Sequence, residues 1–217
     1  MKIINLAERP SLVNRFVMEL RDVGIQKDMM RFRRNLERIG EIMAYEVSRR
    51  LNYKSVEVQT PLAKSAGLVP DEKIVLATIF RAGIPFHYGF LNYFDSAENA
   101  FVSAYRKYKE KENFDVFIEY IASPDLTGKT LILVDPMLAT GASMELSYRA
   151  LLTKGIPAHI HVCSVIASEA AVDYISRTMP ADKTTVWCAA VDPEINEHSY
   201  IVPGLGDAGD LSYGSKL

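Results

Sequence analysis

The fold class is decided by the segment TLILVDPMLATGAS, residues 130–143. Its apolar run at 131–134 is typical of a strand that is covered on both faces of a sheet. Asp135 ends that run, and a loop of small residues with Thr140, Gly141 and Ser143 leads into a segment of helical character at 143–154. The order strand, loop, helix predicts one unit of an α/β fold.

The loop after this strand has the features of a phosphate site. Backbone N–H groups at the start of a helix face an anion with the positive end of the helix dipole. Thr140 and Ser143 can add hydroxyl donors, and Asp135 can accept hydrogen bonds from sugar hydroxyls. An acid for a ribose beside donors for a phosphate indicates a ribose 5-phosphate ligand. The alternative is a plain strand-to-helix turn in which Thr or Ser caps the helix.

Two better-known phosphate loops are excluded by spacing. No Gly-Lys-Ser/Thr follows a glycine four residues earlier, as a nucleoside-triphosphate loop requires. Gly141 also stands alone where the dinucleotide fingerprint needs three spaced glycines.

A second informative segment is NEHSYIVPGLGDAGD, residues 196–210. Its three glycines within 204–209 leave backbone amides open to close approach by a small ligand. A planar base can be read there by main-chain groups, against an apolar wall from Ile201 or Val202. The alternative is a floppy tail, which the apolar residues and the restricting Pro203 disfavour.

Strands and helices alternate along the rest of the chain. Hydrophobic spacing predicts helices at 11–20, 28–51, 84–94, 143–154 and 169–179, and strands at 55–59, 74–80, 131–134, 160–165 and 185–191. Segments 101–105 and 114–121 flank the charged stretch 106–113 and are interpreted as a hairpin with a mobile tip. The alternation predicts a mainly parallel, doubly wound sheet.

Ligands of such sheets bind beyond the carboxyl ends of the strands. Arg81 follows the strand expected at 74–80, and Asp135 follows the strand expected at 131–134. The glycine-rich segment 196–210 comes after the last expected strand. We therefore expect these three features to meet in one site.

Composition narrows the class of protein. The 217 residues are 48% hydrophobic, which suits one globular domain with a sizeable core. A net charge of −2 argues against a dedicated nucleic-acid binder. Cys163 and Cys188 lie singly in apolar runs, so buried free thiols are expected. With no signal-like segment in residues 1–10 and no apolar run of membrane-spanning length, a cytoplasmic protein is the expectation.

The chain resembles the uracil phosphoribosyltransferase family from about residue 28 to its end. The residues that carry the resemblance are DPMLATG at 135–141, IFRAG at 79–83, the pair Tyr105-Arg106 and the segment 196–210. The resemblance implies a type I phosphoribosyltransferase fold, an α/β fold with a mainly parallel sheet flanked by helices, a mobile hairpin flap and a C-terminal base-binding segment. It implies one domain over 1–217, with a helical part at 1–52 and a uracil-binding hood at 192–217.

The implied activity transfers the phosphoribosyl group of phosphoribosyl pyrophosphate (PRPP) to uracil, giving uridine 5′-monophosphate and pyrophosphate in pyrimidine salvage. The resemblance assigns catalysis to Asp135, Arg81 and Asp207. The resemblance assigns PRPP binding to Arg81, Arg106, Asp135, Pro136, Met137, Leu138, Ala139, Thr140, Gly141, Ala142, Ser143 and Asp207. It assigns uracil binding to Ile201, Gly206, Asp207 and Ala208.

Within this set, Arg81 and Arg106 are assigned to the pyrophosphate, for which a guanidinium offers fixed paired donors. A structural salt bridge is the alternative for Arg81, and a solvated surface charge is the alternative for Arg106. Mg²⁺ is expected on the pyrophosphate and its waters, with Asp207 reaching it through water and no direct protein ligand. The four histidines show no metal-ligand spacing, and packing or surface positions are expected for His159 and His161.

The resemblance also raises regulation and assembly. Some relatives are activated by guanosine triphosphate (GTP), and the cluster Lys27, Arg31, Arg33 and Arg34 can bind such phosphates; a solvated helix face or a subunit contact is the alternative. A homodimer or higher homo-oligomer is expected, with no nucleic-acid or membrane partner.

Two other functions stay open. One is a pyrimidine-responsive RNA-binding regulator on the same fold, which needs a basic face that is not evident here. The other is a phosphoribosyltransferase for a purine or orotate, which usually carries two adjacent acids where 134–135 supplies one.

The chain departs from the family pattern at Ala142, where a second glycine is usual. A methyl group resists the left-handed backbone region. We therefore expect Ala142 to have a negative φ, with its amide still facing the phosphate.

Overall fold

The computed structural model describes residues 1–108 and 114–215, without the side chains of 104–117. The central sheet has the order β1-β10-β9-β7-β4-β5-β6, with β8 beside β9. Its strands are β1 (Lys2–Asn5), β4 (Ile74–Phe80), β5 (Glu98–Tyr108), β6 (Phe114–Ala122), β7 (Thr130–Val134), β8 (Met137–Leu138), β9 (His159–Ser168) and β10 (Thr184–Asp192). Each neighbouring pair is parallel except β5 and β6. The expected mainly parallel sheet is confirmed.

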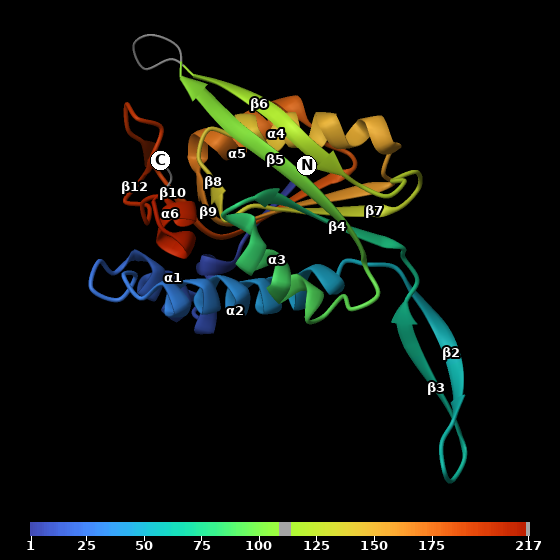
Figure 1. The fold of residues 1–217 in the computed structure, drawn as a ribbon. Coiled ribbons are helices and arrows are strands. Elements are labelled where there is room, and N and C mark those ends of the chain that lie inside the picture. The colour runs from blue at the N-terminus through green and yellow to red at the C-terminus, as the bar shows by residue number, and fades with distance from the viewer. Residues whose placement is uncertain (109–113, 216–217) are drawn as a thin grey trace.

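Helices cover both faces of the sheet (Figure 1). One layer contains α1 (Leu12–Arg21), α2 (Met29–Ser48) and α3 (Gly83–Leu91), and the other contains α4 (Ala142–Leu151) and α5 (Glu169–Thr178). Alternate residues of β7 point to opposite faces of the sheet. Ile132 and Val134 pack in the core with α1–α3, and Leu131 and Leu133 pack with α4 and α5. Burial on both faces is the physical reason for the unbroken apolar run in the sequence.

The first two helices begin next to Ser11 and Asp28, the residues at which the sequence predicts helices to start. Ser11 accepts a hydrogen bond from the N–H of Val13, and Asn14 completes a reciprocal capping box. Asp28 accepts from the N–H of Arg31 and caps α2. Each cap supplies an acceptor to N–H groups that lack a partner within the helix.

The strands Lys2–Asn5 and Lys64–Pro70 are among those that the sequence did not predict. β1 adds a parallel strand beside β10 at the edge of the sheet. The expected strand at 55–59 exists within β2 (Tyr53–Gln59), but it pairs with β3 (Lys64–Pro70) in a separate two-stranded arm that projects from the body (Figure 1). Neither strand of this arm has a buried residue, and β3 shows no alternating hydrophobic pattern in the sequence.

The C-terminal segment, residues 192–215, is folded, so the floppy-tail alternative is wrong there. β11 (Glu194–Ile195) pairs antiparallel with β12 (Ile201–Val202), and helix α6 (Ala208–Tyr213) follows. The sequence did not predict α6. Short 3-10 helices, η1 (Leu6–Glu8) and η2 (Leu152–Lys154), complete the described elements.

Both cysteines are free and buried, as expected. Burial raises the pKa of Cys188 to about 12 and that of Cys163 well above its ordinary value. The hairpin of β5 and β6 is present, but most of its expected mobile tip falls within 109–113, outside the described residues. No described helix has the length and apolar character needed to cross a membrane.

Candidate functional site

The expected site residues follow strands whose carboxyl ends meet at one edge of the sheet. Arg81 follows β4, Asp135 follows β7, and the C-terminal segment begins at the end of β10. β4, β7, β9 and β10 are mutually parallel neighbours, so their carboxyl ends lie on the same side. β12 and α6 lie beside that edge (Figure 1).

The β7–α4 loop, residues 135–141, ends on a left-handed glycine. Gly141 has a φ of 83° and directly precedes α4. A Cβ at Gly141 would lie 2.7 Å from Cδ1 of Tyr174, so both backbone conformation and space favour glycine. Ala142 is the first residue of α4, and Ser199 is the one non-glycine residue with positive φ within the described chain. The negative φ expected for Ala142 is confirmed. Its N–H lies 3.4 Å from Oγ1 of Thr140.

Backbone contacts orient Asp135. Its N–H donates to the carbonyl of Cys163 at 3.1 Å, and its Oδ1 accepts from the N–H of Met137 at 3.2 Å. The first bond holds the backbone, and the second directs the carboxylate toward Met137, where β8 begins.

Sequence reasoning missed Ser168, which anchors the same loop. Its buried hydroxyl donates to the carbonyl of Ala139 at 2.6 Å and accepts from the N–H of Ala171 at 2.9 Å. One side chain therefore caps α5 and holds the β7–α4 loop. A serine immediately before an expected helix was the available signal.

The turn after β4 lies close to the end of β7. A Cβ added to Gly83 would lie 2.2 Å from Oγ1 of Thr78 and 3.3 Å from the carbonyl oxygen of Val134. Glycine lets the start of α3 approach the residue that immediately precedes Asp135. The Arg81 turn and the Asp135 loop are thus neighbours in space.

The Arg81 side chain contacts the C-terminal segment. Its Nη2 donates to Oδ1 of Asp210 at 2.6 Å and to the carbonyl of Gly214 at 3.1 Å. The salt-bridge alternative raised from the sequence thus describes a contact that exists. Asp210 was not among the expected site residues, although it belongs to the glycine-rich segment that was.

An ion pair between the buried carboxylate of Asp192 and a partly buried arginine anchors the start of the C-terminal segment. Arg21 of α1 binds both carboxylate oxygens of Asp192, at 2.7 and 2.8 Å. Arg21 also donates to the carbonyl of Gly204 at 2.8 Å, and the N–H of Gly204 donates to Asp192 at 2.9 Å. The two ends of the β11–β12 hairpin are therefore tied to α1. Sequence spacing gave no signal for this pair.

Asp207 caps α6. Its Oδ1 accepts from the N–H groups of Gly209 and Asp210, at 2.9 and 3.0 Å. Arg33 of α2 donates to the carbonyl of Ser212 at 2.6 Å and lies over the ring of Tyr213. The helix is therefore held against α2.

The residues assigned to uracil lie along one short stretch of this segment. Ile201 is buried in β12, Gly206 is exposed in the following turn, and Ala208 is buried at the start of α6. Arg106 lies on β5, but its side chain is outside the described part of the structure.

Three of the four residues in the basic cluster have partners within the chain. Arg31 pairs with Glu19, Arg34 pairs with Glu37, and Arg33 binds Ser212 as described above. These contacts occupy three of the guanidinium groups, which argues against the interpretation of the cluster as a phosphate site.

The described residues contain no group of three or more His, Cys, Asp or Glu side chains placed to hold a metal ion. His161 is a packing residue, as expected: its Nδ1 accepts from the indole N–H of Trp187 at 3.0 Å, and burial lowers its pKa to about 3. His159 is half-buried, and its Nε2 lies 3.1 Å from Oγ1 of Thr185.

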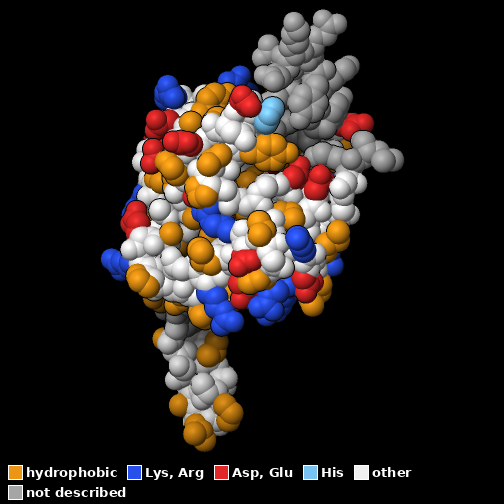
Figure 2. Space-filling view, turned by 90° about the vertical axis from the view of Figure 1, so that its left-hand side faces the viewer, with side chains coloured by type: hydrophobic (Ala, Val, Ile, Leu, Met, Phe, Trp, Pro, Cys, Tyr) orange, Lys and Arg blue, Asp and Glu red, His pale blue; other side chains and the backbone are white. Residues whose placement is uncertain are grey.

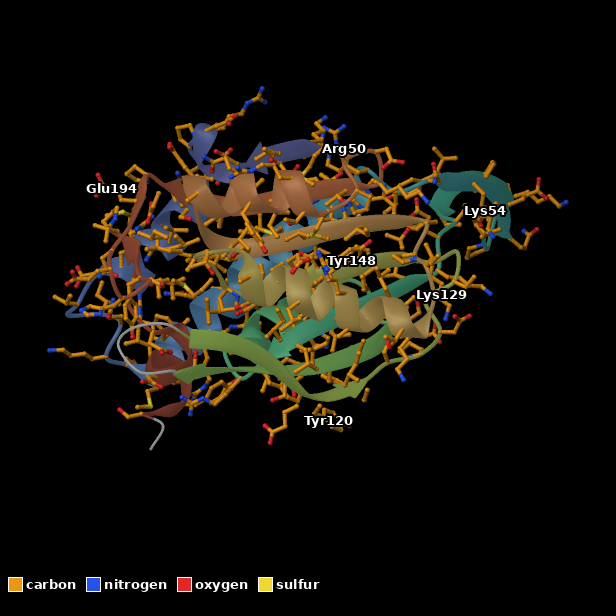
Figure 3. The ribbon with its side chains drawn as sticks, turned by 90° about the horizontal axis from the view of Figure 1, so that it is seen from above. Arg50, Lys54, Tyr120, Lys129, Tyr148 and Glu194 are labelled. Atoms are coloured by element: carbon orange, nitrogen blue, oxygen red, sulfur yellow. The ribbon has the colours of Figure 1, made fainter. Side chains whose placement is uncertain are left out.

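A cavity of about 790 Å³ opens at the opposite edge of the sheet. It lies at the amino ends of β7 and β9, where Thr130 and His159 line it together with Arg50, Lys73 and Lys129. Lys54 and Lys129 lie at one end of the molecule and Glu194 of the C-terminal segment at the other (Figure 3). The cavity is therefore separate from the site formed by Arg81 and Asp135.

Comparison with solved structures defines the class of protein. Orotate phosphoribosyltransferase from Mycobacterium tuberculosis, solved with PRPP, has the same fold at a TM-score of 0.52 and 11% identity, over 87% of this chain and 94% of that one. The AQ2163 protein from Aquifex aeolicus is more similar, at a TM-score of 0.87 and 28% identity over 98% of both chains. The fold is that of the type I phosphoribosyltransferases.

Sequence comparison narrows the class to one family. The model of the uracil phosphoribosyltransferase family matches residues 8–215. A uracil phosphoribosyltransferase from Porphyromonas gingivalis is 66% identical over 217 residues, which is the full length of both chains. The chain belongs to the uracil phosphoribosyltransferase family, as the resemblance of its motifs implies.

Proposed function

We propose that this protein transfers the phosphoribosyl group of PRPP to uracil. N1 of uracil forms a bond to C1 of the ribose, the bond from C1 to the pyrophosphate oxygen breaks with its electron pair on the pyrophosphate, and the N1 proton passes to solvent water. The products are uridine 5′-monophosphate and pyrophosphate. The observation that carries the proposal is the meeting of the Arg81 turn, the Asp135 loop and the C-terminal segment at one edge of the sheet.

The β7–α4 loop and the start of α4 would hold the ribose 5-phosphate. Asp135 accepts hydrogen bonds from the ribose hydroxyls, and its fixed carboxylate stabilises positive charge that develops on the ring. Residues 136–143 surround the 5-phosphate with backbone N–H groups and with the hydroxyls of Thr140 and Ser143.

Arg81 and Arg106 would bind the pyrophosphate and stabilise the charge that it gains as it leaves. Holding both reactants in line is the main contribution of such a site, because the chemistry needs no covalent enzyme intermediate. We assign no general base, since hydrogen bonds to the uracil oxygens make its N1 proton more acidic.

The C-terminal segment, which we propose acts as the hood over the base, would present uracil to C1. Main-chain groups of Ile201, Gly206 and Ala208 read the edge of the base. Asp207 lies at the N-terminus of α6, adjacent to Ala208, where its carboxylate can contact PRPP.

Mg²⁺ fits this arrangement as an ion carried mainly by the substrate. The described residues do not bring three His, Cys, Asp or Glu side chains together to hold a metal ion. Asp207 would reach the ion through water, in keeping with the preference of Mg²⁺ for oxygen ligands and retained waters. When bound, the ion neutralises charge on the pyrophosphate.

The test is direct synthesis of uridine 5′-monophosphate from uracil, PRPP and Mg²⁺. Asp135→Asn should lower kcat/KM by about 100-fold or more, because the ribose loses a charged partner at the reacting carbon. Asp125→Asn is the matched control, since Asp125 precedes the same strand at the opposite edge. Preference for orotate or hypoxanthine over uracil would contradict the proposed base, and RNA retention at moderate salt would favour the regulator.

We also propose that the protein forms a homodimer or higher homo-oligomer through its β2–β3 arm. Hydrophobic side chains cluster on the projecting arm (Figure 2), where Leu62 is 96% exposed and Leu68 is 71% exposed. Exposed apolar groups on an isolated hairpin indicate a contact surface. Light scattering should show a smaller species for Leu62→Ser combined with Leu68→Ser; an unchanged mass would contradict the assignment.

We also propose, from the family resemblance, that GTP activates this protein. Assays with and without GTP on wild type and Arg34→Ala test the basic cluster without disturbing the contact of Arg33 with α6. Unchanged activation in the variant would remove Arg34 from consideration.

A further inference from the structure

Both hydrogens of Arg81 Nη2 have acceptors in the structure. One acceptor is Asp210 Oδ1 at 2.6 Å, and the other is the carbonyl oxygen of Gly214 at 3.1 Å. Each paired-donor face of a guanidinium uses Nη2, together with either Nη1 or Nε. With Nη2 engaged, Arg81 can offer an anion single hydrogen bonds but no paired donors.

We propose that Asp210 is a positioning residue whose carboxylate competes with the diphosphate of the substrate for Nη2 of Arg81. The inference rests on the proposed function, which assigns Arg81 to pyrophosphate. Paired binding of a diphosphate oxygen then requires α6 to give up a contact at Asp210 or Gly214. Arg81 thereby links the occupancy of the diphosphate position to the docking of the C-terminal helix.

The exchange is feasible because the ion pair is partly solvated. The side chain of Arg81 is 38% exposed and that of Asp210 is 33% exposed. Pairs with this exposure contribute little to stability, so a diphosphate with two or more charges can displace the carboxylate. The buried pair of Arg21 with Asp192 keeps the remainder of the segment in place.

Displacement of Asp210 from Arg81 should also affect the proposed uracil site. Asp210 lies in the first turn of α6, its N–H donates to Asp207, and Ala208 begins the same helix. Release of Asp210 therefore loosens α6, which begins with Ala208 and is capped by Asp207, two of the residues assigned to uracil. Arg33 continues to hold the helix at Ser212.

Asp210→Asn tests the competition, because asparagine keeps the size and loses the charge. Calorimetric titration with pyrophosphate and Mg²⁺ should give a Kd about twofold to fivefold lower than in wild type, the range of an exposed ion pair. Asp210→Glu should restore a Kd near that of wild type. Glu197→Gln removes an equal charge from an exposed position in the same segment and should leave the Kd unchanged.

A Kd that is unchanged or higher in Asp210→Asn would overturn the inference, since a merely structural role predicts weaker binding. Hydrogen exchange in wild type provides a test that needs no variant. Pyrophosphate with Mg²⁺ should accelerate exchange of the amides at 210–214, and unchanged or slower exchange would also overturn it. If wild type makes no uridine 5′-monophosphate but Asp210→Asn still binds pyrophosphate more tightly, the proposed function fails and the inference stands.

Discussion

The β7–α4 loop and the C-terminal segment lie at the same edge of the sheet, but they are held in different ways. The loop joins a strand and a helix that are consecutive in the chain. Its Gly141 turn and the contact of Asp135 with Met137 are local, and its one side-chain anchor described above, Ser168, is 29 positions away. The C-terminal segment depends on residues far away in sequence: Arg21 reaches Asp192 across 171 positions, and Arg81 reaches Asp210 across 129.

The two parts of the site are therefore positioned by different kinds of contact. The loop takes its geometry from strand and helix packing, which many side chains share. The C-terminal segment buries Ile201, Leu205 and Ala208 in the core, and a few charged contacts with α1, α2 and the β4–α3 turn fix its ends. Loss of one charged partner should therefore displace the segment while the loop stays formed.

The largest effect is expected from Arg21→Ala. It leaves the carboxylate of Asp192, which is 5% exposed, without its cationic partner. The free energy of unfolding should fall by about 3–5 kcal/mol, the usual cost of breaking a buried pair. Denaturant unfolding measures it, with Arg49→Ala at the exposed pair with Glu46 as a control near zero. A loss similar to the control would show that the segment has other anchors.

Gly141→Ala should distort the β7–α4 loop, whose geometry depends on local backbone conformation. The variant must accept a φ of 83° and a Cβ 2.7 Å from the Tyr174 ring, which should cost about 1–2 kcal/mol for the backbone alone. Affinity for PRPP should fall as the loop shifts.

Gly128→Ala is the matched control for Gly141→Ala. Gly128 has a similar φ of 71°, and a Cβ added there would have no atom within 4 Å. The difference in stability loss between the two variants therefore measures the cost of the contact with Tyr174. Equal destabilisation by the two variants would show that the ring moves aside freely.

Acid should weaken the helices that carry the anchoring arginines. Hydrogen bonds from Arg31 and Asn35 lower the pKa of Glu19 from 4.5 to about 2. Because the folded pKa is the lower one, this contribution to stability is complete above about pH 4.5 and is lost as the pH falls toward 2. The gap in Tm between wild type and Glu19→Gln should narrow over that range; a constant gap would contradict the assignment.

The smallest effect is expected from Ala142→Gly. Ala142 is already helical, so glycine gains no needed freedom and should lower stability by less than about 1 kcal/mol. The Kd for PRPP should stay within about twofold. A larger gain in affinity would show that the methyl group obstructs the phosphate.

Several parts of the fold were predictable because their causes are local. The apolar run of β7, the caps at Ser11 and Asp28 and the turn at Gly141 all follow from hydrophobic pattern and backbone chemistry. β1 and β3 were not predictable in the same way. β1 is a partly exposed edge strand and β3 is wholly exposed, so neither shows the alternation that marks a half-buried strand.

The sequence by itself determined the α/β architecture, the order of the strand, loop and helix at Asp135, and the family to which the chain belongs. Those features depend on residues that are neighbours in the chain. Only the tertiary structure decided that Asp210 forms an ion pair with Arg81, that Arg21 forms one with Asp192, and that Ser168 hydrogen-bonds to the β7–α4 loop. Such pairs form between segments brought together by packing of the whole sheet, and no spacing in the sequence records which partners will meet.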